Sequence, residues 1–194
     1  MLFAGKTYII SPRHGFFGKM KFLSDIRLLF IGTWLGAAFF FIAVAQSAFA
    51  VLPEREMAGL IVNRTLAILN YSGLAIAILL AALSFPGQSG VNRILLWSER
   101  ILLLIFAAAC AIGQFVIGWW LLLLRSEMGK PIDQVAVDDP LRIQFNNLHE
   151  YSVWVLFSGM FAALIAFFVI ANRKSGAAKS SGAGIYDFQK EFKI

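Results

Sequence analysis

The chain has 194 residues, of which 59% are hydrophobic and 14% charged, and its formal net charge is +6. Soluble domains carry about 25% charged residues, so this composition excludes an ordinary soluble globular protein and favours an integral membrane protein. The basic residues lie beside apolar runs rather than on a separate basic helix, which favours contacts with anionic lipid and argues against nucleic-acid binding. Cys110 is the single cysteine, so an internal disulfide is excluded.

Four long apolar runs follow one another along the chain, at about 27–52, 60–85, 101–124 and 152–171. A helix needs about 20 apolar residues to cross the hydrocarbon core of a bilayer, and each run reaches that length. Because lipid offers no hydrogen-bond partners to the backbone, such runs are expected to be helical. The sequence therefore predicts an all-α integral membrane protein built as a four-helix bundle.

Composition divides the chain into three predicted parts. A basic N-terminal segment (1–26) precedes the four-transmembrane-helix domain (27–172), and a basic tail (173–194) follows it. Asp139 directly before Pro140 is the pattern of an N-cap followed by proline at the first helical position. We therefore expect the fourth helix to begin well before its apolar run and to extend beyond the membrane on the outer side.

The distribution of basic residues predicts the orientation of the bundle. Twelve of the 17 Lys and Arg residues lie in the N-terminal segment with the adjoining Arg27, in the second connection and in the tail, and five lie on the opposite side. By the positive-inside rule, both termini are expected in the cytoplasm. The expected partners are the lipid bilayer and, as alternatives, other membrane proteins or a second copy of the chain.

Polar side chains at membrane depth are the strongest functional signal in the chain, because they are costly unless paired or hydrated. A rise of about 1.5 Å per residue places most of them in the outer half of the bundle. One stripe on the fourth helix, by steps of three and four, is formed by Arg142, Phe145, His149, Ser152 and Leu156. If this stripe faces inward, its polar members line an outward-opening pocket that binds a small molecule or ion. The complete predicted ligand-binding set is Gln46, Asn63, Arg64, Asn70, Gln114, Arg142, Phe145, His149 and Ser152.

Two other hypotheses remain open. Asn and Gln also join membrane helices through hydrogen bonds worth about 0.6 kcal/mol, in which case the protein is a non-catalytic accessory subunit of a larger membrane complex. The aromatic tail from Tyr186 to Ile194 would then contact a partner.

A redox or metal enzyme is the third hypothesis. It is disfavoured because His14 and His149 are predicted on opposite sides and cannot share one haem. We expect no catalytic residue, no metal site and no cofactor.

Several segments resemble the transmembrane-protein-205-like family, a four-helix membrane domain of unknown function found in many bacteria. They are Trp34-Leu-Gly36-Ala-Ala-Phe-Phe-Phe41, Val51-Leu-Pro53, Ala58-Gly59 and, with the greatest similarity, Asp139 to Ser152. The resemblance covers about 27–172 and implies four helices, no established enzymatic activity and a place in the bacterial inner membrane. Its eukaryotic relatives are linked to resistance to platinum drugs, which implies the handling of a small molecule or metal complex.

Overall fold

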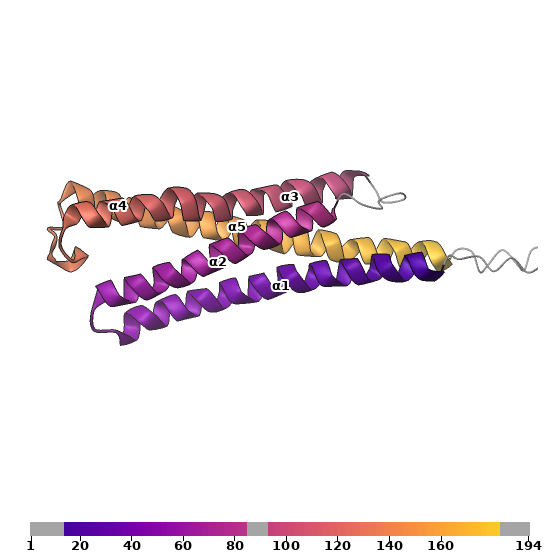
Figure 1. Cartoon of the computed structure of the whole chain (residues 1–194), viewed down its shortest axis with the longest axis horizontal. Helices are drawn as coiled ribbons and strands as arrows, with labels where there is room; N and C mark the ends of the chain where they lie inside the picture. Colours follow the sequence, from indigo (N-terminus) through magenta and orange to yellow (C-terminus); the bar gives the residue numbers. More distant parts are fainter. Residues whose placement is uncertain (1–13, 85–92, 183–194) are drawn as a thin grey trace, which may run out of the picture.

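The computed structural model describes residues 14–84 and 93–182, and the side chains of 22–84 and 93–172 (Figure 1). Every regular element in those ranges is helical. Four helices are long and apolar enough to cross a membrane, and they are Phe22–Val51, Arg55–Leu83, Arg93–Met128 and Pro140–Asn172. The prediction of four membrane-crossing helices in an all-α chain is confirmed.

The elements follow a simple up-and-down order. They are α1 (His14–Val51), α2 (Arg55–Leu83), α3 (Arg93–Ala111), the π-helical segment η1 (Ile112–Gly118), α4 (Trp119–Met128), the short 3-10 helix η2 (Ile132–Gln134) and α5 (Pro140–Gly182). α3, η1 and α4 together form one continuous crossing. Helices α1 and α5 run past the predicted divisions at 26/27 and 172/173, so that division into three parts stays a prediction.

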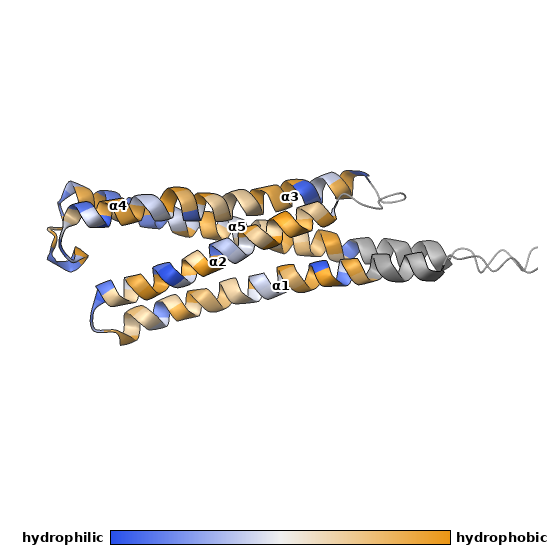
Figure 2. Cartoon of the chain, viewed as in Figure 1, coloured by the Kyte–Doolittle hydropathy of each residue, from blue (hydrophilic) through white to orange (hydrophobic). Residues whose placement is uncertain are grey.

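Figure 1 shows which helix ends lie together. The start of α1, the end of α2, the start of α3 and the end of α5 lie at one end of the bundle, called here the termini end. The end of α1, the start of α2, α4, η2 and the start of α5 lie at the other, called here the loop end. Hydrophilic residues gather at the loop end, and hydrophobic residues dominate between the two ends (Figure 2).

The start of α5 has the predicted cap. The Asp139 carboxylate accepts a hydrogen bond from the backbone N–H of Leu141 at 2.8 Å, and Pro140 is the first helical residue. The preceding turn follows Gly129, whose φ of +60° ends α4 in a left-handed conformation that suits glycine. Local sequence chemistry therefore determines where the last crossing begins.

The core lies where the four crossings meet. Trp34 of α1 is buried, donates its indole N–H to the Leu69 carbonyl of α2 at 3.0 Å, and meets the Phe106 ring edge-on with centroids 4.4 Å apart. Small side chains let the backbones approach closely, as is usual for membrane helices. At Gly73 the approach is so close that a Cβ would lie 2.6 Å from the indole nitrogen of Trp34.

Candidate functional site

A small cavity lies in the middle of the bundle, among α1, α2, the third crossing and α5. It measures about 10 Å³, which is room for about one water molecule. It brings together two of the nine predicted ligand-binding residues, Asn70 and Ser152. Its walls are formed by Trp34, Leu66, Asn70, Ala109, Cys110, Gly113, Ser152, Val155, Leu156 and Gly159.

Asn70 is the polar residue that defines this mid-bundle cavity. Its side chain is 5% exposed, and within the described ranges its carboxamide has no hydrogen-bond partner. Other polar groups at the cavity are engaged: the Ser152 hydroxyl donates to the His149 carbonyl at 2.6 Å, and Trp34 donates to Leu69.

The backbone of the third crossing changes its form beside Asn70. The segment η1 winds as a π-helix, a form that is rare and often occurs at functional sites. Gly113 near its start has no side chain, and a Cβ there would lie 3.2 Å from the Asn70 Nδ2 atom. The carboxamide of Asn70 therefore lies directly against the π-helical backbone.

At the loop end, charged side chains join neighbouring elements. Arg125 of α4 pairs with Glu56 of α2 at 3.1 Å and donates to its backbone carbonyl at 3.4 Å. Arg142, a member of the predicted ligand-binding set, donates to the Val135 carbonyl at 2.5 Å. These contacts attach α4 to α2 and the loop around η2 to α5.

A larger groove lies between α4 and the first turns of α5 at the loop end, with a volume of about 450 Å³. This loop-end groove is lined from both helices at spacings of three and four residues, so each helix presents one continuous face to it. The lining residues are Trp120, Leu123, Leu124 and Glu127 of α4, and Gln144, Asn147, Leu148 and Tyr151 of α5.

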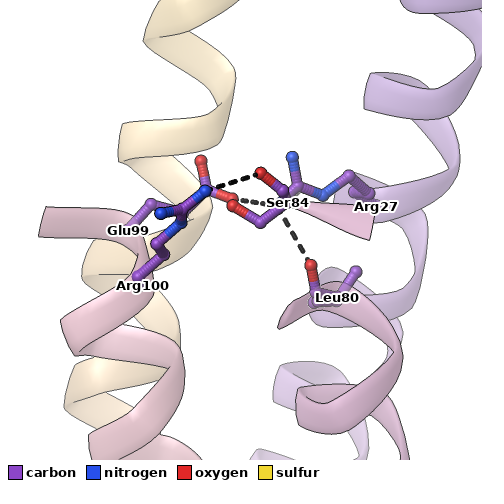
Figure 3. A network of polar contacts seen from close by, with 5 residues as sticks. All are labelled: Arg27, Leu80, Ser84, Glu99 and Arg100. Atoms are coloured by element: carbon purple, nitrogen blue, oxygen red, sulfur yellow. Dashed lines mark hydrogen bonds and ion pairs between the residues drawn. The ribbon is translucent and has the colours of Figure 1, made fainter. Parts of the chain in front are cut away.

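The termini end holds a buried ion pair that the sequence analysis did not single out (Figure 3). Arg27 of α1 pairs with Glu99 of α3, and these side chains are 7% and 0% exposed. Arg27 also donates to the Leu80 carbonyl at 3.4 Å, and Arg100 donates to the Ser84 carbonyl at 3.3 Å. Two guanidinium groups therefore bond the carboxyl end of α2, where the helix dipole favours positive charge.

Sequence spacing carries a signal for the burial of Glu99. The buried residues of α3 are Glu99, Leu103, Phe106 and Cys110, at steps of four, three and four that define one helical face. An acidic residue on such an apolar face predicts a buried partner. The third apolar run begins at about 101, so Glu99 falls just outside it in the sequence.

The other seven predicted ligand-binding residues do not line the mid-bundle cavity or the loop-end groove. Gln46, Arg64 and His149 are exposed, and Arg64 has no hydrogen-bond or ion-pair partner in the described part of the chain. Asn63, Gln114, Arg142 and Phe145 are half-buried, with Gln114 inside η1. Ligand binding by this set stays a prediction.

Across residues 22–84 and 93–172, whose side chains the structure describes, no three His, Cys, Asp or Glu side chains converge on a point that could hold a metal ion. Cys110 is buried against Gly73, with its sulfur 2.7 Å from where a Cβ on that glycine would lie.

The fold and its lipid-facing surface define a multi-pass membrane protein with four crossings. A family model described as a domain of unknown function, DUF4149, matches residues 29–130. The chain belongs to this family. The match includes Asn70 and Glu99, and it ends before Asp139–Ser152, the segment with the greatest expected resemblance to the transmembrane-protein-205-like family. No curated protein and no solved structure matches the chain.

Proposed function

We propose that the protein is a non-catalytic membrane protein that binds a small amphipathic molecule in the loop-end groove. The observation that carries this proposal is the volume of the groove, about 450 Å³, which lies within the range of about 300–1,000 Å³ typical of small-molecule sites. The mid-bundle cavity is far too small for such a ligand. The proposed function therefore remains the binding of a small molecule, but the proposed site lies between α4 and the start of α5 and not at the residues predicted from the sequence.

The lining of the groove favours an organic cation with an apolar part. Glu127 is the only charged residue in the lining, and among the residues described it forms no ion pair, since Arg125 pairs with Glu56 instead. Trp120 and Tyr151 offer aromatic faces for a cation, and Leu124 and Leu148 offer apolar surface. An ammonium group against Glu127 would form a charge-assisted contact.

The position of the groove relative to the membrane supports access from outside the cell. Trp97 and Trp119 are exposed and lie 22 residues apart, which is about 33 Å along a helix and close to the hydrocarbon thickness of about 30 Å. Tryptophan marks membrane interfaces, so Glu127 would lie in the outer aqueous region. In this proposed orientation both termini lie in the cytoplasm and the start of α5 protrudes outward from a bacterial inner membrane. We also propose that the protein is related to the transmembrane-protein-205-like family, which its sequence resembles.

Titration calorimetry with benzyltrimethylammonium, on the protein in lipid nanodiscs, tests the groove. We expect Glu127→Gln to lower the affinity about tenfold, or about 1.4 kcal/mol, because it removes the charge that faces the cation. Glu150→Gln is the matched control, since Glu150 is an exposed carboxylate of α5 that does not line the groove. No binding by the wild type, or equal affinities in the wild type and Glu127→Gln, would contradict the proposal.

An accessory role in a larger membrane complex is the second candidate. The observation that favours it is that polar groups form contacts within the chain, between α4 and α2 at Arg125–Glu56 and between α5 and the loop after η2 at Arg142–Val135. A stoichiometric subunit seen by native mass spectrometry, and retained in Glu127→Gln, would favour this role. The tail from Tyr186 to Ile194, the expected docking segment, lies outside the described residues.

A further inference from the structure

The mid-bundle cavity is independent of the loop-end groove and has a ligand chemistry of its own. A carboxamide has two N–H donors and an acceptor oxygen, and Asn70 is buried with no partner for these groups in the described part of the protein. The side chain lines the cavity. In the middle of a membrane, where lipid supplies no hydrogen bonds, such a group favours any small polar molecule that can reach it.

The other walls supply the further partners that a bound molecule needs. Ser152 of α5 uses its hydroxyl hydrogen on the His149 carbonyl, so its oxygen remains able to accept a hydrogen bond. The Cys110 thiol of α3 is a weak donor and acceptor. A buried water makes about two to four hydrogen bonds, and these groups, from three helices, meet that requirement.

The π-helical segment explains why space exists at this point. Gly113 lacks a side chain where Asn70 touches η1, and the Gly113 carbonyl lies 3.2 Å from where a Cβ on Gly118 would be. That position places the carbonyl beside the residue five positions ahead, as in π-helical winding. The backbone therefore departs from regular α-helix at the depth of the unpartnered amide.

We propose that the mid-bundle cavity is a hydrated site, where one water molecule, or a neutral hydrogen-bonding molecule of that size, binds the Asn70 carboxamide. Ser152 borders the cavity and is half-buried, and His149, one turn toward the loop end, is exposed. Water therefore enters from the loop end along α5. The centre of the bundle therefore exchanges with solvent.

The single cysteine makes this proposal measurable. Cys110 lines the cavity and is buried, and because the chain has one cysteine, the infrared S–H stretching band has one source. Transfer of the full protein in nanodiscs from water to D₂O converts S–H to S–D only where water reaches the thiol. We expect conversion within minutes in the wild type.

Asn70→Leu keeps the volume of the side chain and removes its hydrogen bonding, so we expect conversion to slow at least tenfold. Asn63→Leu is the matched control, because Asn63 lies two turns away on α2, is half-buried and does not line the cavity. It should exchange like the wild type. Circular dichroism and gel filtration show that each variant is folded. If Asn70→Leu does not fold, Ser152→Val narrows the same site from α5 and should slow conversion likewise.

Two results would overturn the proposal. One is a folded wild-type protein whose S–H band persists for a day in D₂O. The other is equal conversion rates in the wild type and in the folded variant, Asn70→Leu or Ser152→Val, because exchange would then occur through general opening of the bundle.

Discussion

The termini end and the loop end of the bundle are both held by arginine–carboxylate pairs, yet the pairs differ in burial. At the termini end, Arg27 and Glu99 are 7% and 0% exposed, whereas Arg125 and Glu56 at the loop end are 27% and 39% exposed. A third pair, Arg55 with Asp133 at 3.8 Å, is more exposed still. The same kind of ion pair therefore lies in a low-dielectric interior at the termini end and near the solvent-exposed surface at the loop end.

The difference in burial determines how much each ion pair contributes to the stability of the bundle. Exposed ion pairs contribute about 0–1 kcal/mol, because water screens them and two long side chains must be ordered. Removing one partner of a buried pair leaves an unpaired charge and costs about 3–5 kcal/mol. The ion pair at the termini end therefore contributes more to the stability of the bundle than the pairs at the loop end.

The largest effect is expected when Glu99 is removed. Glu99→Ala removes the carboxylate that pairs with the buried Arg27 guanidinium, so the free energy of unfolding should fall by about 3–5 kcal/mol. Reversible unfolding in mixed detergent, followed by circular dichroism, measures it. Replacing both partners together, in Arg27→Leu with Glu99→Leu, should recover much of the loss because no charge remains buried. If Glu99→Ala costs no more than Glu56→Ala, the contrast between the two ends is wrong.

Packing gives an intermediate effect, and two glycines make a matched pair. A Cβ at Gly73 would lie 2.6 Å from the Trp34 indole nitrogen and 2.7 Å from the Cys110 sulfur, whereas one at Gly36 meets nothing within 4 Å. Gly73→Ala should therefore lower the midpoint of thermal unfolding, at a cost of about 1–3 kcal/mol from overpacking. Gly36→Ala should leave it unchanged or slightly raised, since alanine favours helix. Equal shifts would show that the crossing of α1, α2 and α3 is looser than the contacts indicate.

The smallest effect is expected at the loop end. Arg125→Ala removes the partly exposed pair with Glu56 and should cost less than about 1 kcal/mol. The same unfolding assay measures it, and a salt titration sharpens the result, because the wild-type advantage should shrink as ionic strength rises. A loss of several kcal/mol that is insensitive to salt would contradict the prediction, because the Arg125–Glu56 pair would then contribute as much stability as the buried Arg27–Glu99 pair.

The sequence predicted the helices better than the site. Apolar run length gave the four crossings, and the Asp139–Pro140 pattern gave the start of α5, because both depend on local chemistry. Of the nine predicted ligand-binding residues, Asn70 and Ser152 line one cavity, and ligand binding by the set stays a prediction. The loop-end groove was missed, since Glu127, Gln144 and Tyr151 belong to an α4–α5 contact whose register no local pattern reveals.

The stripe on α5 shows why the rest was harder. Arg142, Phe145, His149 and Ser152 do share one side of the helix by spacing, but the structure gives them different surroundings: Arg142 bonds the loop, His149 is exposed and Ser152 borders the cavity. Spacing fixes which residues share a face of a helix. It does not fix which neighbour each turn of that face meets.

The sequence by itself determined the solvent, the number of crossings and the points where helices begin, because a backbone in lipid must satisfy its hydrogen bonds within each helix. Only the tertiary structure decided which polar groups meet. Arg27 and Glu99 are 72 residues apart, and the position of Asn70 against η1 depends on how α2 and the third crossing pack. Such contacts arise from the close approach of several helices, which small residues permit but do not specify.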